Sequence, residues 1–156
     1  MKLFPALLIA ACPLAAGATA ASAQDLSARP TYATVDLTSG FPNDPYDVSV
    51  SSGGSVDASN IGSPCTGFIA SAPDVRLNYQ SGSLPLYIYA TSESDTTLVV
   101  NAPDGQWYCD DDSNGGLNPQ VTFLKPQSGQ YDIWIGTYAS SDYRPATLHI
   151  SELARD

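Results

Sequence analysis

An aspartate-rich segment carries the most specific chemical pattern in this sequence. Asp110, Asp112 and Asn114 stand at alternate positions, and Gly115 follows them directly. Oxygen-bearing side chains at alternate positions can curl around one ion, and the glycine permits the sharp turn that this requires. All of these groups are hard oxygen ligands, which favours calcium over zinc, because zinc prefers cysteine and histidine. The pattern therefore predicts a calcium site.

The segment departs from a complete EF-hand loop. Its twelfth position holds Val121 in place of the usual glutamate, and the flanking residues are typical of strands rather than helices. Further ligands must therefore come from elsewhere, for example from Asp95 or from backbone carbonyls. The alternative is an exposed acidic turn that protects a sheet edge from aggregation. Three adjacent carboxylates repel one another, which favours the metal site over this alternative.

Short β-strands are the elements that must position this loop. Runs of alternating apolar and polar residues recur along the chain, separated by glycine, proline, asparagine, aspartate and serine. No window after residue 23 keeps a helical period. The sequence therefore predicts an all-β fold, a jelly-roll-like β-sandwich of about eight antiparallel strands. The expected strands are 46–50, 67–70, 75–79, 84–91, 96–100, 120–124, 130–138 and 146–151.

The chain divides into three parts. Residues 1–23 combine a positive start, a short apolar stretch and a small-x-small end, which indicates a cleaved secretory signal peptide. Lipidation at Cys12 is the alternative for this segment. Residues 24–44 are expected to form an extended lead-in, and residues 45–156 the β-sandwich domain. We therefore expect an exported protein without a membrane span, either periplasmic or extracellular.

Two cysteines, Cys65 and Cys109, follow the expected signal peptide. In an oxidising compartment an isolated pair normally forms a disulfide, and the alternative is a pair of reduced, buried thiols. The formal net charge of the chain is −10, from 16 acidic and 6 basic residues. Nucleic acid needs clustered lysine and arginine, so this composition argues against it as a partner.

Strand alternation also assigns side chains to faces. It predicts that Tyr87, Tyr89 and Trp134 alternate with core residues and form a ligand face for a sugar or a protein surface. The alternative is that these rings pack beneath loops. The core prediction from the same alternation comprises Val75, Leu77, Tyr79, Tyr131, Ile133, Ile135, Leu148 and Ile150.

The second half of the chain presents a series of short motifs in a fixed order. They are Ser94–Val100, the Asp104-Gly105 turn, Cys109–Asp112, Asn118-Pro119 and Ser128–Gly136. Over roughly residues 66–151 this order resembles the bacterial pre-peptidase C-terminal domain. The resemblance implies a jelly-roll sandwich with calcium, and a non-catalytic role beside secreted proteases. With the loop pattern it gives the candidate ligand set Asp95, Asp110, Asp111, Asp112, Asn114 and Asn118.

Catalytic machinery is not recognisable. A serine-protease triad needs a histidine, and the sole histidine, His149, is expected to face outward near the C-terminus. Neither Gly-Asp-Ser-Gly-Gly nor Gly-x-Ser-x-Gly occurs, and Glu93 and Glu152 do not define a glycosidase pair. Some short exported proteins with the same family resemblance carry a peptidase S1 label, but these residues give that label no support.

Three functional hypotheses follow from the sequence. The first is a non-catalytic, calcium-binding exported module that acts in binding, adhesion or envelope structure, with a protein or a carbohydrate as partner. The second is an accessory or inhibitor-like partner of a secreted protease, which rests on the family resemblance alone. The third is a hydrolase whose catalytic residue the sequence does not identify.

Overall fold

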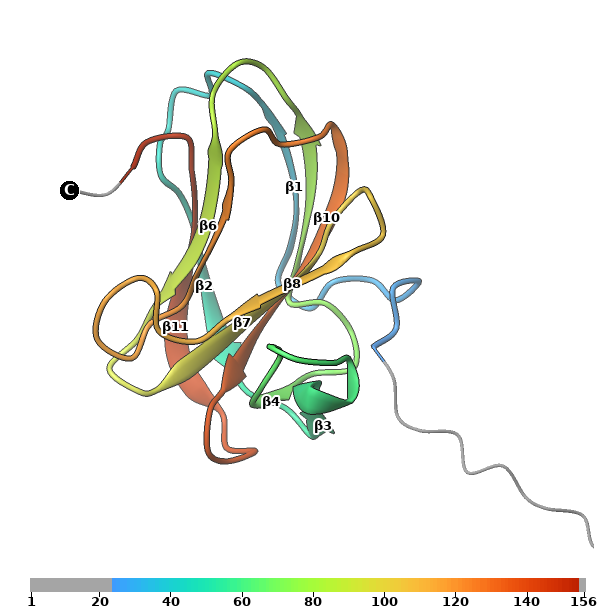
Figure 1. Ribbon diagram of the computed structural model, residues 1–156, viewed down its shortest axis with the longest axis vertical. Helices are drawn as coiled ribbons and strands as arrows, with labels where there is room; N and C mark the ends of the chain where they lie inside the picture. Colours follow the sequence, from blue (N-terminus) through green and yellow to red (C-terminus); the bar gives the residue numbers. More distant parts are fainter. Residues whose placement is uncertain (1–23, 155–156) are drawn as a thin grey trace, which may run out of the picture.

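Two β-sheets packed face to face form the protein, as the computed structural model shows for residues 24–154 (Figure 1). The predicted all-β sandwich is confirmed. The predicted signal peptide, residues 1–23, and Cys12 lie outside the described residues. Within the described range a short 3-10 helix, η1 (Ala58–Asn60), accompanies the strands, and no helix is long and apolar enough to cross a membrane.

Sheet A contains seven strands of the described chain and runs in the order β1–β5–β10–β4–β3. In addition, β7 pairs with β10 and carries β8. Most neighbours are antiparallel, but β1 and β5 are parallel. The strands are β1 (Ala33–Thr38), β3 (Val56–Asp57), β4 (Phe68–Ile69), β5 (Val75–Gln80), β7 (Thr96–Asn101), β8 (Trp107–Asp110) and β10 (Gly129–Thr137).

Sheet B contains four strands of the described chain in the order β2–β11–β6–β9, all antiparallel. Its outer strands are β2 and β9. The strands are β2 (Tyr46–Ser52), β6 (Leu86–Thr91), β9 (Gln120–Phe123) and β11 (Arg144–Ser151).

Three strands of sheet A were absent from the sequence-based expectation. The segment expected as a lead-in contains β1, which pairs along its whole length with β5. Its alternation, with Val35 buried and Asp36 exposed, spans too few residues between Pro30 and Gly40 to stand out. The strands β3 and β8 are two and four residues long, too short to show a period.

The main core lies between the two sheets, where inward side chains of both sheets meet. The predicted core residues of β5, β10 and β11 are buried, which confirms their assignment from alternation. Burial of each large apolar side chain contributes roughly 1.5–3 kcal/mol, so this cluster dominates the stability of the sandwich.

A second apolar cluster covers the opposite face of β10. Trp134, which was expected to face solvent, is fully buried there against Val56, Ala58 and Val99. Its ring centroid lies 5.5 Å from that of Trp107. The prediction of an exposed Trp134 is therefore wrong, because β3, β4 and η1 fold over this face of the sheet.

Along one edge, β10 pairs first with β5 and then with β4. Ile135 lies at the change of partner and pairs with neither strand on that edge. The pairing with β5 ends at Ile133, and the pairing with β4 is at Thr137. The Ile135 N–H donates to Asp74 Oδ2 at 2.7 Å, and the Ile135 carbonyl accepts from the Gly53 N–H at 2.9 Å. Both backbone groups of this buried residue are thereby satisfied, as burial requires.

Burial raises the pKa of Asp74 to about 7, and the bond from Ile135 offsets only part of the rise. The folded protein then keeps a proton that the unfolded chain releases near the ordinary value of 3.8. The stability that Asp74 contributes is therefore complete at low pH and is lost as pH rises toward about 7. Relative to an Asp74→Asn variant, we expect the wild type to lose stability over this window. Urea unfolding between about pH 4 and pH 8 measures this, and parallel pH profiles of the two proteins would contradict it.

Candidate functional site

The Asp-rich segment forms a loop between β8 and β9. The Asn114 N–H donates to the Asn118 carbonyl at 2.9 Å and closes the turn. Gly115 and Gly116 have φ values of 87° and 65°, a left-handed conformation that glycine adopts at little cost. The glycines therefore permit the turn, as the sequence pattern predicts.

Asp110 holds this loop to the beginning of β9. Its Oδ2 accepts the backbone N–H groups of Ser113 at 2.9 Å and of Gln120 at 2.8 Å, and its Oδ1 accepts the Ser113 hydroxyl at 2.6 Å. Both carboxylate oxygens are thus engaged inside the protein. Asp110 therefore shapes the loop, and its role as an ion ligand stays a prediction.

The two asparagines of the predicted ligand set attach the loop to the end of β6. The Asn118 Oδ1 accepts the Ser92 N–H at 2.9 Å, and the Asn114 Nδ2 donates to the Ala90 carbonyl at 3.3 Å. These bonds span more than twenty positions of sequence and fix the loop against sheet B. The asparagines therefore position the loop, and the remaining carboxylates are left beside it.

Those carboxylates belong to Asp95, Asp111 and Asp112. The Oδ1 of Asp95 is buried and has no hydrogen-bond partner within residues 24–154. Burial raises the pKa of Asp95, and the negative charges of Asp112 and Asp111 raise it further. A buried carboxylate oxygen near two like charges is unfavourable unless a cation compensates it. Asp95 is therefore the residue of the predicted set that most needs a positive partner.

These side chains alone do not enclose an ion. Across the described chain, no three acidic, histidine or cysteine side chains are grouped closely enough to hold a metal. Asp111 is half-buried and Asp112 is exposed, so both have room to turn toward Asp95. Calcium also accepts backbone carbonyls and water among its roughly six to eight ligands. A calcium ion at this place would therefore need further oxygen ligands besides these carboxylates.

The disulfide predicted from the cysteine count is present between Cys65 and Cys109. It joins the segment before β4 to β8 across a sequence separation of 44 residues. Closing a loop of this length stabilises by roughly 4 kcal/mol in the chain-entropy model. Because Asp110 and Asp111 follow Cys109 directly, the bond also anchors the base of the acidic loop.

A second polar centre, which the sequence does not reveal, surrounds His149 on the outer face of sheet B. The His149 Nδ1 lies 2.6 Å from Asp47 Oδ1, and its Nε2 lies 2.8 Å from Thr91 Oγ1. The order carboxylate, imidazole, hydroxyl is that of a hydrolase triad. The N–H of Ser92, beside Thr91, already donates to Asn118, so it does not serve as an oxyanion donor.

Strand register accounts for this arrangement, and no catalytic role is needed to explain it. Asp47, His149 and Tyr89 stand directly opposite one another on β2, β11 and β6, and the rings of His149 and Tyr89 stack with centroids 4.6 Å apart. We interpret the group as a cross-strand polar row that ties three strands together. No sequence signal could have found it, because strand register depends on long-range pairing.

The predicted aromatic ligand face does not form. Tyr89 is only 5% exposed beneath its contact with His149, and Tyr87 is half-buried. Trp134 belongs to the other sheet and is fully buried. The prediction that these three rings share a surface is therefore wrong, because Trp134 lies on a different sheet from Tyr87 and Tyr89.

Comparisons with known proteins do not assign a family. No protein-family model matches the chain, and no curated protein matches it either. Among solved structures, the chain is similar to PliG of Aeromonas hydrophila, a periplasmic lysozyme inhibitor of g-type lysozyme. The identity is 15%, the match covers 76% of this chain and 97% of that chain, and the TM-score is 0.42. Neither value is high enough to equate individual residues of the two proteins.

An Asp110→Ala variant tests the structural role of this carboxylate. It leaves the N–H groups of Ser113 and Gln120 without their acceptor, so we expect the free energy of unfolding to fall by about 1–3 kcal/mol. The matched variant Asp111→Ala breaks no hydrogen bond of the described structure, and its stability is expected to change little. Denaturant unfolding in calcium-free buffer compares them, and equal losses would show that Asp110 does not hold the loop.

Proposed function

We propose that the protein is a non-catalytic, exported binding module whose acidic end takes up calcium. One observation carries the metal part of the proposal. The buried Oδ1 of Asp95 has no partner in the described chain, and the charges of Asp111 and Asp112 lie close enough to raise its pKa. A calcium ion would neutralise the three carboxylates, with Asp95 as the buried ligand and the other two as exposed ligands.

The positions of these residues suggest what calcium would do. Asp95 precedes β7, Asp111 follows β8, and these strands pair with each other. The Asp95 carbonyl accepts the N–H of Tyr138, the first residue after β10. An ion between Asp95 and Asp111 would therefore join two strand ends beside a third, and would order the loops at this end of the sandwich.

Other features support export and the absence of catalysis. The disulfide is favoured in an oxidising compartment, as found outside the cytosol. His149 stands opposite Asp47 and Tyr89 in strand register and stacks on the Tyr89 ring, which favours a structural role for the imidazole. The resemblance to the pre-peptidase C-terminal domain stays a prediction, and this proposal does not depend on it.

Thermal unfolding with calcium and with EDTA tests the metal site. At a hundred times the dissociation constant, calcium would stabilise the folded state by about 2.7 kcal/mol and raise the Tm by several degrees. An Asp95→Asn variant should lose this response. Because the pKa of Asp95 is raised, its charge is unfavourable in the folded protein at neutral pH. The variant should therefore melt higher than the wild type in EDTA.

An Asp36→Asn variant is the matched control, because Asp36 lies on β1, away from the acidic loop. It should keep the full calcium response. A wild-type Tm that is the same in calcium and in EDTA would make the loop an acidic turn and would reject calcium as a ligand.

Inhibition of a secreted hydrolase is the second candidate function. The observation that favours it is a pair of exposed tyrosines, Tyr138 at 45% and Tyr143 at 66%, in the connection between β10 and β11. Tyrosine is enriched among residues that dominate binding energy at protein interfaces. The pair lies on the loop that contacts Asp95, so calcium would also influence it.

Activity assays of purified hydrolases test this candidate. A trypsin-like protease, a subtilisin-like protease and a g-type lysozyme would each be measured with an excess of the protein. We expect inhibition of one enzyme and relief of that inhibition by Tyr138→Ala combined with Tyr143→Ala. Leu124→Ala, which removes an even more exposed apolar side chain elsewhere, should give no relief. Full activity of all three enzymes would leave the candidate without support.

A further inference from the structure

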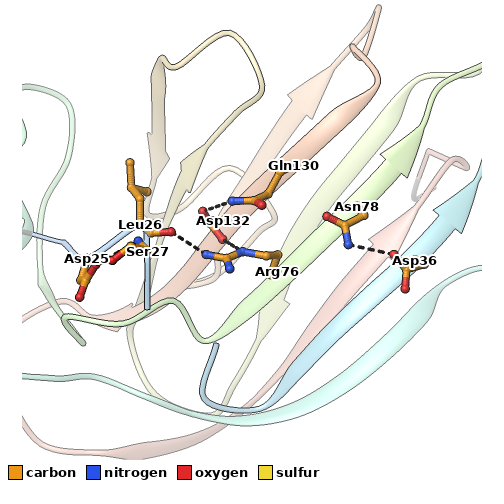
Figure 2. A network of polar contacts seen from close by, with 8 residues as sticks. All are labelled: Asp25, Leu26, Ser27, Asp36, Arg76, Asn78, Gln130 and Asp132. Atoms are coloured by element: carbon orange, nitrogen blue, oxygen red, sulfur yellow. Dashed lines mark hydrogen bonds and ion pairs between the residues drawn. The ribbon is translucent and has the colours of Figure 1, made fainter. Parts of the chain in front are cut away.

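An open hollow lies on the outer face of sheet A, apart from the acidic loop and from His149. It has a volume of about 400 Å³ and spans β1, β5 and β10. Strand register places Asp36 opposite Asn78, and Asn78 opposite Gln130, so these three side chains form one row across the sheet. Figure 2 shows the three on the same face of their strands. Thr38 and Gln80 form the next row and also line the hollow.

Hydrogen bonds hold the row in place before any ligand arrives. The Asn78 Nδ2 donates to Asp36 Oδ1 at 2.8 Å, and the Gln130 Nε2 donates to Asp132 Oδ2 at 2.8 Å (Figure 2). Asp132 is only 2% exposed, so Gln130 is attached to a group that itself cannot move freely. Side chains fixed in this way lose little conformational entropy on binding a ligand.

The positive charge nearest to the hollow, on Arg76, is already paired. The Arg76 Nε donates to Asp132 Oδ1 at 2.7 Å, and the Arg76 Nη2 donates to the Leu26 carbonyl at 2.8 Å. The guanidinium is thus neutralised by a buried carboxylate and by the backbone of the N-terminal segment. It offers no unpaired positive charge, and Asp36 adds a negative one, so the hollow does not suit an anion.

The groups that line the hollow match the hydroxyls of a sugar. Amides both donate and accept hydrogen bonds, a carboxylate accepts them, and each sugar hydroxyl can do both. Leu37 and Tyr79 also line the hollow, so it presents apolar surface beside these polar groups. Its volume falls within the range of roughly 300–1,000 Å³ that is usual for small-molecule sites.

We propose that this hollow binds a neutral oligosaccharide through Asp36, Asn78, Gln80 and Gln130. The inference gives the proposed binding role a ligand class and does not need the metal. Gln130 lies near one end of β10, whereas Thr137, at the other end, pairs with Thr96 beside Asp95. The two sites are thus separated by most of the length of this strand, and each can be lost without the other.

An amide-resolved NMR titration tests the proposal. The probes are cellotetraose, maltotetraose and tetra-N-acetylchitotetraose, with tetragalacturonic acid as the anionic comparison. We expect at least one neutral probe to shift the side-chain amide signals of Asn78 and Gln130, and the anionic probe to shift neither. Saccharide binding should persist in EDTA and in the Asp95→Asn variant, so its failure and the failure of the calcium site are distinguishable.

Variants of the amide row complete the test. Asn78→Ala combined with Gln130→Ala should weaken binding of that probe roughly tenfold or more, since each removes hydrogen bonds to the ligand. Gln120→Ala, a glutamine of sheet B, should bind as the wild type does, and melting curves would show that all variants fold. No shift on β1, β5 or β10 with any neutral probe, or unchanged affinity in the double variant, would overturn the proposal.

Discussion

The burial of β10 on both faces is the constraint on which the rest of the structure depends. Ile133 and Ile135 point into the main core, and Trp134 points into the second cluster. From Tyr131 to Thr137 the strand is buried, so polar groups there are favoured when they have partners within the protein. Asp74 supplies one to the backbone of Ile135, and Arg76 supplies one to the carboxylate of Asp132. These two contacts meet this requirement for the backbone of Ile135 and for Asp132.

The same strand separates the two proposed sites. Near the beginning of the strand, Gln130 lines the hollow on sheet A. Its side chain donates to Asp132, which is paired with Arg76. At its last residue Thr137 pairs with Thr96, which brings Tyr138 beside Asp95 and the acidic loop. At one end hydrogen bonds hold the polar side chains in place, whereas the other end contains carboxylates whose like charges repel one another. This contrast fits a rigid binding surface at one end and a metal-dependent loop cluster at the other.

Local pattern accounts for the parts of the fold that could be predicted. The alternation of Val75 and Leu77 and the cysteine count led correctly to the main core and the disulfide. Trp134 could not be placed, because the segments that cover it are too short to show a period. In the acidic loop the motif indicated Asp110, whose carboxylate bonds to the backbone of β9, but it did not show that the Asp95 Oδ1 is buried without a partner in the described chain. Such outcomes depend on register, which sequence patterns do not contain.

We propose that Asp95 and the acidic loop bind calcium together. The most direct measurement is a crystal structure of the mature, oxidised protein grown with calcium, with the ion identified by its anomalous scattering. We expect one ion at roughly 2.3–2.6 Å from the Asp95 Oδ1 and at the same distance from a carboxylate oxygen of Asp111 or Asp112. An ordered loop at saturating calcium with no ion there, and with the Asp95 Oδ1 bound to another protein group, would contradict it.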